Sequence, residues 1–359
     1  MEWATLAAAA AVYARRIPMV VAVVGGAAVM AQRWYGEDSC TADIDESSAE
    51  GLCDANSYAE AKANTLLIQV PVLGTTKTFW RLSDEATRIT RKLALILRSH
   101  HSVGKYLTAD LQMSNIWISY SGSVKLRGVS FTDQDFSIKS VRDDYKRLSS
   151  VMQAFILISG GDITKLPPDY KEFLTLLGSE TLEMEDEFLI VNSSALLPMK
   201  NRTEVFLMLH GKIMDLSRKQ ADQADKKKMM KILSKLPYKK DWLNTARANA
   251  KINQWVVDVK NPYKMTQFDL LRLNRNVRSH LHQYGDDNVE EILYCEWPEL
   301  LLAMETMLHV EGELEDCDIQ NKFGGDVGSG GSGVRTEDPY GGRRSRGSRG
   351  DGATLVRRG

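Results

Sequence analysis

The spacing of apolar residues predicts a series of helices with a few short strands among them. Over residues 82–99, apolar side chains recur every three or four positions, which is the period of an amphipathic helix, and Ser83 is placed to cap its start. Residues 123–126 have the length of a short strand, and residues 121–122 before them indicate a turn from a preceding strand. The uncharged, largely apolar run 148–159, which a Gly pair follows, predicts a buried helix.

A second amphipathic helix is predicted from residue 266 onward. Thr266 and Asp269 have the spacing of a capping box, in which each side chain bonds the backbone N–H of the other residue. One face of this helix is apolar and carries Leu270, Leu273, Val277 and Leu281. The opposite face carries side chains that can bind phosphate or move a proton, namely Arg272, Arg275, Asn276, Ser279 and His280.

The N-terminal residues differ in composition from the middle of the chain. Residues 17–31 are uncharged and follow two arginines, so residues 1–35 are expected to form a signal peptide, a transit peptide or a membrane anchor. The uncharged run is shorter than the roughly 20 residues that span a bilayer. Residues 36–78 are expected to be a linker, because most of this stretch is polar, acidic and rich in small residues.

The C-terminal residues are dominated by glycine and arginine. The sequence from residue 324 onward contains 12 of the 26 glycines of the chain and few apolar side chains. Such a sequence buries too little apolar surface to offset its chain entropy, so residues 313–359 are expected to be a disordered tail. The tail either binds RNA through its arginines or only keeps the chain in solution.

Charge is unevenly distributed, although 46 Lys and Arg nearly balance 47 Asp and Glu. Residues 212–278 hold 17 basic and 6 acidic residues, whereas residues 286–316 hold 11 acidic residues and no Lys or Arg. Such blocks create an electrostatic pattern on a nearly neutral chain. The four cysteines include no C-x-x-C pair, which excludes a disulfide-built scaffold and a zinc finger or ribbon.

Residues 106–119, which follow the first helix, resemble the catalytic loop of protein kinases. Asp110 and Asn115 stand at the spacing of the H-R-D-L-K-x-x-N motif, but Thr and Ala replace its His and Arg. Gly-Val-Ser stands where the magnesium-binding D-F-G sequence belongs, and no Gly-rich loop or V-A-x-K strand is found upstream. The resemblance implies a degenerate kinase C-lobe over residues 79–200 without kinase activity, in which Asp110 and Asn115 are remnants.

The polar face of the second helix carries the groups needed to cleave RNA. Guanidiniums can hold a phosphate, an amide can orient it, and an imidazole that titrates near neutrality can move a proton. Residues 269–280 read D-L-L-R-x-x-R-N-x-x-x-H, which is similar to the signature of the KEN (kinase-extension nuclease) domain. Residues 297–301 resemble the aromatic-Pro-x-Leu-Leu turn near the end of that domain. KEN follows a kinase domain in the inositol-requiring kinase/ribonuclease of the unfolded-protein response and in ribonuclease L.

The resemblance implies an all-helical KEN-type ribonuclease domain over residues 201–312, which cuts RNA without a metal or another cofactor. By position, Arg275 and Asn276 would bind the scissile phosphate, and His280 would act as general acid or base. The family also uses a Tyr upstream of the motif, for which Tyr263 is the candidate although it stands one residue too close. Two further residues are expected to bind the substrate, Arg272 and Arg278.

The expected fold is therefore mainly α, with a truncated kinase-like C-lobe joined to the KEN-type domain. Two functions remain open. The first is an endoribonuclease in RNA processing. The second is a non-catalytic pseudokinase/KEN module that binds RNA or regulates a full-length family member, which the lost kinase machinery and a shortened segment after His280 favour. The family acts as dimers, so the expected partners are RNA and either a second copy or a full-length kinase/ribonuclease. We expect a cytoplasmic protein, with membrane attachment through residues 17–31 as the alternative.

Other polar clusters have simple structural interpretations. The pair at residues 100–101, two histidines, lies at a helix end, where imidazoles commonly bond free backbone carbonyls. Residues 180–187 contain five acids and are expected to be an exposed loop. The lysines at 226–228 are expected to contact RNA phosphates or to form a solvated helix face. Trp242 and Trp255 have the spacing of helix-core residues.

Overall fold

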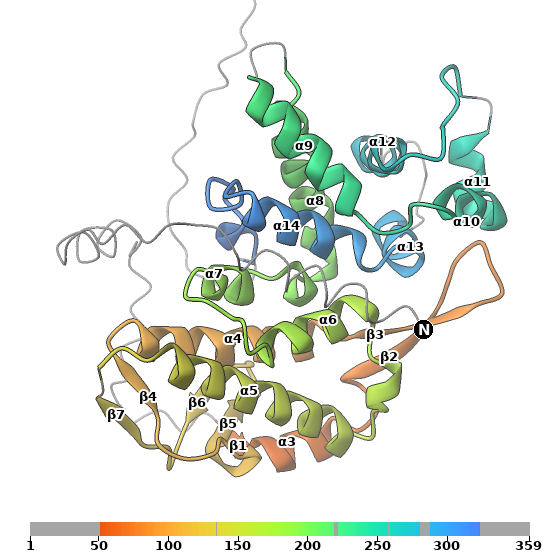
Figure 1. The fold of residues 1–359 in the computed structure, drawn as a ribbon. Helices are drawn as coiled ribbons and strands as arrows, with labels where there is room; N and C mark the ends of the chain where they lie inside the picture. Colours follow the sequence, from red (N-terminus) through yellow and green to blue (C-terminus); the bar gives the residue numbers. More distant parts are fainter. Residues whose placement is uncertain (1–50, 134, 219–221, 258, 281–287, 324–359) are drawn as a thin grey trace, which may run out of the picture. The chain divides into compact units, whose positions relative to one another are not determined.

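The described part of the chain is mainly helical, as the sequence predicts, with 12 α-helices and seven short strands (Figure 1). The computed structural model describes residues 51–133, 135–218, 222–257, 259–280 and 288–323. The hydrophobic segment expected over residues 1–35 and the Gly- and Arg-rich sequence from residue 324 onward lie outside these residues. None of the helices within them combines the length and the apolar composition needed to cross a bilayer.

The first half of the described chain combines short antiparallel strands with two long helices. In chain order its elements are β1 (Leu52–Asp54), α3 (Ala55–Ala61), β2 (Leu67–Pro71), β3 (Thr78–Leu82), α4 (Asp84–His101), β4 (Lys105–Leu107), η1 (Met113–Asn115), β5 (Ile116–Ser119), β6 (Val124–Leu126), β7 (Phe131–Asp133), α5 (Ile138–Ile158), η2 (Ile163–Lys165), α6 (Pro168–Leu177), α7 (Asp186–Val191) and η3 (Ser194–Leu196). The strands form a three-stranded sheet in the order β1-β5-β6, the hairpin β2–β3, and the pair β4–β7. Helices α4 and α5 pack against each other (Figure 1).

Three sequence predictions for this half are confirmed. Ser83 caps α4, because its hydroxyl accepts a hydrogen bond from the Ala86 N–H at 3.2 Å. Strands β5 and β6 form the expected antiparallel hairpin, with Ile118 opposite Val124. The apolar run from residue 148 forms the second part of α5, in which Leu148 is fully buried. The spacing of apolar residues and the capping residues were sufficient to predict these elements, because the local sequence preferences agree with the packing of the folded chain.

The prediction of a linker over residues 36–78 is wrong from residue 52 onward. Asp54 caps α3 by accepting hydrogen bonds from the N–H groups of Asn56 and Ser57. Tyr58 of α3 is buried and its ring stacks on Phe155 of α5, with ring centroids 6.3 Å apart. The apolar residues of this part, such as Leu66, Leu67 and Val72, reach the core, and the polar, acidic residues before them concealed the ordered elements when the whole stretch was averaged.

The second half of the described chain contains helices alone. Its elements are α8 (Met199–Asp215), α9 (Gln223–Lys235), α10 (Trp242–Ala248), α11 (Ala250–Val256), α12 (Gln267–Ser279), α13 (Val289–Glu296), α14 (Leu300–Val310) and η5 (Gln320–Phe323). Trp242 and Trp255 are buried in its core, as their spacing predicts. The expectation of a disordered tail is wrong for residues 313–323, because Leu314 and Ile319 are fully buried in the same core, and the rest of that tail lies outside the described residues.

Buried polar side chains join the two halves. Asp169 of α6 is fully buried, where its carboxylate pairs with Arg202 of α8 at 3.3 Å and accepts a hydrogen bond from the Tyr294 hydroxyl of α13 at 2.9 Å. Glu305 of α14, also fully buried, accepts a hydrogen bond from the Ser194 N–H at 2.7 Å. Groups buried in this way require their partners, so each half depends on the other.

The Glu305 carboxyl makes the stability of the junction depend on pH. Burial raises the pKa of Glu305 to about 8, against a lesser opposing effect of its hydrogen bond from Ser194. Between about pH 4.5 and 8 the folded protein therefore keeps a proton that the unfolded chain has lost, and stability falls as pH rises across this window. Glu305→Gln is neutral at every pH and keeps an oxygen for the Ser194 N–H. We expect it to stabilise the protein by about 2 kcal/mol at pH 7, and less at pH 5.

Urea unfolding at pH 5, 6, 7 and 8 measures this difference. Glu180→Gln, which removes an exposed carboxylate paired with Lys146 at the surface, is the matched control and should change stability by less than about 0.5 kcal/mol at each pH. An equal pH dependence in Glu305→Gln and the parent would contradict the assignment of the buried proton.

Candidate functional site

Helix α12 is positioned by its cap and by its buried face. The Thr266 hydroxyl accepts a hydrogen bond from the Asp269 N–H at 3.1 Å, so the helix begins where the sequence predicts. The Asp269 carboxylate bonds the Lys264 N–H at 2.7 Å rather than completing the box at Thr266. Leu270 and Leu273 are fully buried. The cap thus fixes both the start of α12 and the preceding loop, residues 261–265.

Tyr263 lies in contact with the polar face of α12. The Asn276 amide donates a hydrogen bond to the Tyr263 hydroxyl at 3.2 Å, and the Asn276 carbonyl accepts one from the Arg275 guanidinium at 3.2 Å. Arg275 is exposed and Asn276 half-buried. Tyr263 therefore reaches the predicted site despite its shortened spacing, because the loop held by Asp269 folds back along the helix.

His280 is the C-cap residue of α12. It follows Asn276 by four positions, so both lie on the same side of the helix end, and His280 is exposed to solvent. Hydrogen bonds thus link Tyr263, Arg275 and Asn276, and His280 follows one turn beyond Asn276, so a phenol, a guanidinium, an amide and an imidazole are grouped along α12 and its preceding loop. Three of these groups bind phosphate oxygens well, and an imidazole is a common general acid or base.

Arg272 holds Tyr263 in place. Its guanidinium stacks on the Tyr263 ring, 4.3 Å from the centroid, and donates a hydrogen bond to the Asn261 carbonyl at 2.9 Å. It also lies 3.1 Å from the Asp269 carboxylate. These contacts give Arg272 a role in positioning Tyr263, and its expected role in binding the substrate stays a prediction.

Arg278 is a buried structural residue, which corrects its expected role in substrate binding. Its guanidinium makes two hydrogen bonds to the Glu290 carboxylate of α13, at 2.7 and 2.8 Å, and a third to the Asn274 side chain at 2.7 Å. It also covers the Phe206 ring of α8 at 4.1 Å. With these contacts Arg278 joins three helices and leaves no donor side open to an RNA strand.

The sequence did not single out a second histidine beside the site. His210 of α8 is half-buried, and its ring stacks on Phe206 one turn earlier, with centroids 6.2 Å apart. Burial, together with the nearby positive charge of Arg275, lowers the pKa of His210 to about 4. His210 is thus a neutral imidazole next to a phosphate-binding candidate. Its position 65 residues before Arg275 gave no local pattern that could have revealed the contact.

Asp110 and Asn115, the two residues of the first half that match the kinase motif, form hydrogen bonds and an ion pair within the protein. The Asp110 side chain is 86% exposed and pairs with Arg147 at 3.2 Å. The Asn115 carbonyl accepts a hydrogen bond from the Gln112 N–H at 3.0 Å, and its amide donates to the Arg127 carbonyl at 3.2 Å. Both side chains therefore hold the loop through these contacts.

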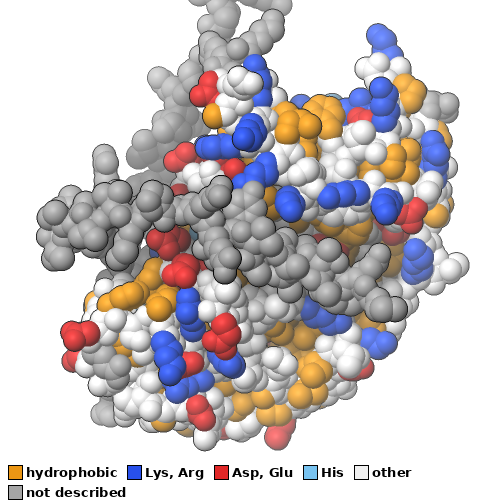
Figure 2. All heavy atoms as spheres, viewed as in Figure 1, with side chains coloured by type: hydrophobic (Ala, Val, Ile, Leu, Met, Phe, Trp, Pro, Cys, Tyr) orange, Lys and Arg blue, Asp and Glu red, His pale blue; other side chains and the backbone are white. Residues whose placement is uncertain are grey.

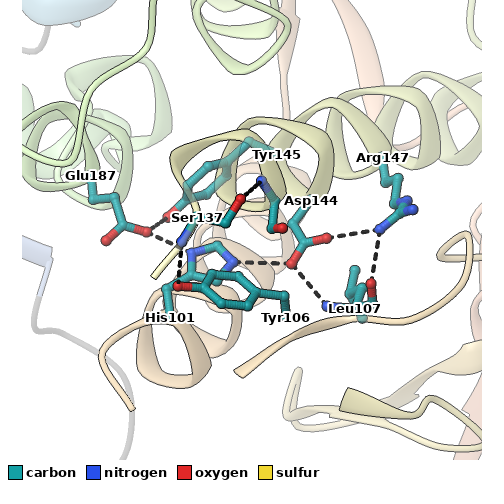
Figure 3. Close-up of polar contacts among 9 residues, drawn as sticks. His101, Tyr106, Leu107, Ser137, Asp144, Tyr145, Arg147 and Glu187 are labelled. Carbon is teal, nitrogen blue, oxygen red and sulfur yellow. Dashed lines mark hydrogen bonds and ion pairs between the residues drawn. The ribbon is translucent and has the colours of Figure 1, made fainter. Parts of the chain in front are cut away.

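A buried charge cluster lies behind this loop (Figure 3). His101 of α4 contacts Glu187 of α7 at 2.7 Å and Asp144 of α5 at 3.1 Å. Burial alone would lower the pKa of His101, but its hydrogen bonds to Asp144 and Glu187 outweigh burial and raise it. Asp144 also accepts a hydrogen bond from the Leu107 N–H at 3.0 Å. His101 thus binds carboxylates rather than the helix-end carbonyls expected, and Glu187 is buried rather than part of an exposed loop.

The basic and acidic blocks of the sequence lie beside each other in the second half. Lys212 of α8 pairs with Glu313 at 3.1 Å, and Lys228 of α9 bonds the same carboxylate at 2.5 Å. Part of the basic surplus is therefore neutralised within the chain. Other basic residues of the block are exposed, and in Figure 2 Lys and Arg side chains are spread over the upper part of the view, where α9, α10 and α12 lie.

Comparison with known proteins does not assign the chain to a family. No model of a known protein family matches the sequence, and no curated protein matches it significantly. The function is therefore inferred from the residues of the chain and from the resemblance of its motifs.

Proposed function

We propose that the protein is a metal-independent endoribonuclease of the KEN type that acts in RNA processing. The observation that carries the proposal is the hydrogen bond between Tyr263 and Asn276, because it joins a loop residue to the helix motif in one site. Tyr263, Asn276 and Arg275 are thereby linked by hydrogen bonds, and the exposed His280 lies one turn beyond Asn276 at the end of α12.

The proposed reaction transfers the phosphate to the neighbouring ribose hydroxyl. The 2′-oxygen forms a bond to phosphorus, the bond from phosphorus to the 5′-oxygen breaks, and the products are a 2′,3′-cyclic phosphate and a 5′-hydroxyl end. The 2′-hydroxyl loses one proton and the 5′-oxygen gains one, so the reaction needs general acid and base catalysis. His280 exchanges the proton, while Arg275 and Asn276 bind the phosphate oxygens and Tyr263 fixes Asn276.

The kinase-like half serves as a scaffold in this proposal. Asp110 is paired with Arg147, and the sequence lacks the Asp and Lys residues that hold magnesium and phosphates in kinases. The exposed lysines and arginines around α9 and α12 attract the RNA backbone and increase the rate of encounter. The partners that follow are RNA and, by the family resemblance, a second copy or a full-length kinase/ribonuclease.

Cleavage of a structured RNA by the purified protein, with and without EDTA and over a range of protein concentrations, tests the proposal. We expect cleavage that EDTA leaves unchanged, that yields cyclic-phosphate ends, and that rises steeply with concentration if the protein acts as a dimer. Asn276→Leu should lower the rate by about a hundred-fold, because a single donor to a developing charge contributes on that scale.

Gln254→Leu is the control, since it removes an exposed amide from α11 away from the motif face. A folded protein that cuts no RNA at any concentration would refute the nuclease. It would instead support the non-catalytic module, and the search would turn to RNA binding and to regulation of a full-length family member.

A further inference from the structure

The β2–β3 hairpin of the first half extends to α10 and α11 of the second half (Figure 1). At its tip the Gly74 carbonyl accepts a hydrogen bond from the Ala250 N–H at 2.8 Å, and the Leu73 carbonyl accepts one from the Asn249 amide at 3.0 Å. Farther along, Arg81 pairs with Glu291 at 2.9 Å. The hairpin is therefore fixed to the helices at its tip and along its length.

The contact at the tip requires glycine. Gly74 has a φ of +85°, which disfavours other residues, and a Cβ at this position would lie 2.2 Å from the Asn249 side chain. All the hydrogen-bonding capacity of Asn249 is used, since its amide also bonds Glu296 at 2.8 Å and its carbonyl accepts from the Lys251 and Ile252 N–H groups. The walls beside the tip are thus formed before any ligand arrives.

A hollow of about 480 Å³ lies between the hairpin tip and the helices. Its lining residues are Gly74, Thr75, Thr76, Lys77, Thr245, Ala248, Asn249 and Glu296. This volume lies in the range of about 300–1,000 Å³ that small-molecule sites occupy. It exceeds what a single amino acid or an inorganic anion fills, so a ligand of nucleotide size suits it better.

The two walls of the hollow offer complementary chemistry. The hairpin wall presents the Lys77 ammonium and the Thr76 hydroxyl, and the helical wall presents the Thr245 hydroxyl and one carboxylate oxygen of Glu296. Among the described residues, Thr76, the Lys77 ammonium and the Thr245 hydroxyl have no hydrogen-bond or ion-pair partner. The ammonium of Lys77 and the hydroxyl of Thr76 can donate hydrogen bonds to an anionic group of a ligand. The carboxylate of Glu296 can accept a hydrogen bond from a ligand hydroxyl.

We propose that this hollow binds a ribose phosphate unit, supplied by a free nucleotide or by an RNA strand. Lys77 and Thr76 bind the phosphate, while Glu296 and Thr245 bind the ribose hydroxyls. The site shares no residue with the face of α12, so it does not rest on the proposed nuclease.

Equilibrium binding to the full chain tests the proposal, with adenosine 5′-monophosphate, its 2′-deoxy form and inorganic phosphate as probes. A short RNA oligonucleotide is added in the His280→Ala background. We expect saturable binding that Lys77→Gln weakens roughly ten- to a hundred-fold, because it removes a charge-assisted hydrogen bond. Lys139→Gln, which removes an exposed lysine at the start of α5, is the matched control and should change nothing.

Glu296→Gln tests the ribose end separately. It keeps an oxygen for the Asn249 amide but loses the carboxylate acceptor, so the preference for the ribonucleotide over its 2′-deoxy form should fall to about one. Binding of the mononucleotide with these variant effects would assign a free nucleotide, and binding of the oligonucleotide alone with the same effects would assign an RNA strand. No saturable binding, or binding that Lys77→Gln leaves unchanged, would overturn the proposal. Because the readout is binding, it is independent of whether the protein cleaves RNA.

Discussion

His280→Ala is expected to lower the rate of RNA cleavage by roughly a thousand-fold while leaving the stability of the protein within about 0.5 kcal/mol of the parent. The activity falls because proton transfer by a positioned side chain contributes about 10²–10⁴ to a rate. The fold persists because the His280 side chain is exposed at the end of α12. Single-turnover cleavage and urea unfolding of the same preparations measure the two effects.

Ser279→Ala is the matched control for His280→Ala, since Ser279 is the exposed neighbour in the last turn of α12. It should cleave RNA at nearly the parental rate. Full activity in His280→Ala would show that another group moves the proton, and His210 would be examined next. Its imidazole is neutral and close to Arg275.

Arg278→Ala is expected to destabilise the protein by about 3–5 kcal/mol. The substitution leaves the Glu290 carboxylate buried without its cation, and an uncompensated buried charge costs on that order. Denaturant unfolding followed by circular dichroism measures the loss. Any loss of cleavage should follow the loss of folded protein, and the rate per folded molecule should remain close to that of the parent.

Two comparisons separate a structural role of Arg278 from a role in binding. Arg275→Ala removes an exposed guanidinium from the same helix, so it should weaken RNA binding and change stability by less than about 0.5 kcal/mol. The double variant Arg278→Met with Glu290→Leu should regain much of the stability, because it leaves no buried charge behind. An Arg278→Ala protein of parental stability with weakened RNA binding would restore the role first expected from the sequence.

The difference between Arg275 and Arg278 was present in the sequence. Projected along a helix of 3.6 residues per turn, Arg278 falls between Leu270 and Leu271, whereas Arg275 falls beyond Leu271, toward the polar face. Leu271 is fully buried, and Arg278 shares its side of α12. If Leu271 had been included in the apolar face of the predicted helix, Arg278 would have been predicted to be buried. Its partner Glu290 was beyond prediction, because only the tertiary arrangement brings α13 beside α12.

Sequence patterns of neighbouring residues predicted helices and strands correctly, but they did not predict contacts between residues that are far apart in the sequence. The helix caps at Ser83 and Thr266 and the hairpin β5–β6 depend on neighbouring residues, and they are found where expected. The contact of Tyr263 with Asn276 depends on a loop that the Asp269 carboxylate holds against the helix. The number of residues between Tyr263 and the motif therefore did not predict this contact. Glu187 lies in an acidic run, and only its burial against His101 distinguishes it from exposed neighbours.

The buried pairing of Asp169 with Arg202 and Tyr294 has a consequence for the history of such a chain. The first half is free to accumulate substitutions only at positions on which nothing else depends. A substitution at Asp169 leaves the Arg202 guanidinium and the Tyr294 hydroxyl of the other half without this partner. It therefore destabilises the whole protein and lowers its solubility and its lifetime. Substitutions in the first half are thereby confined to its outer surface and to loops that the second half does not contact.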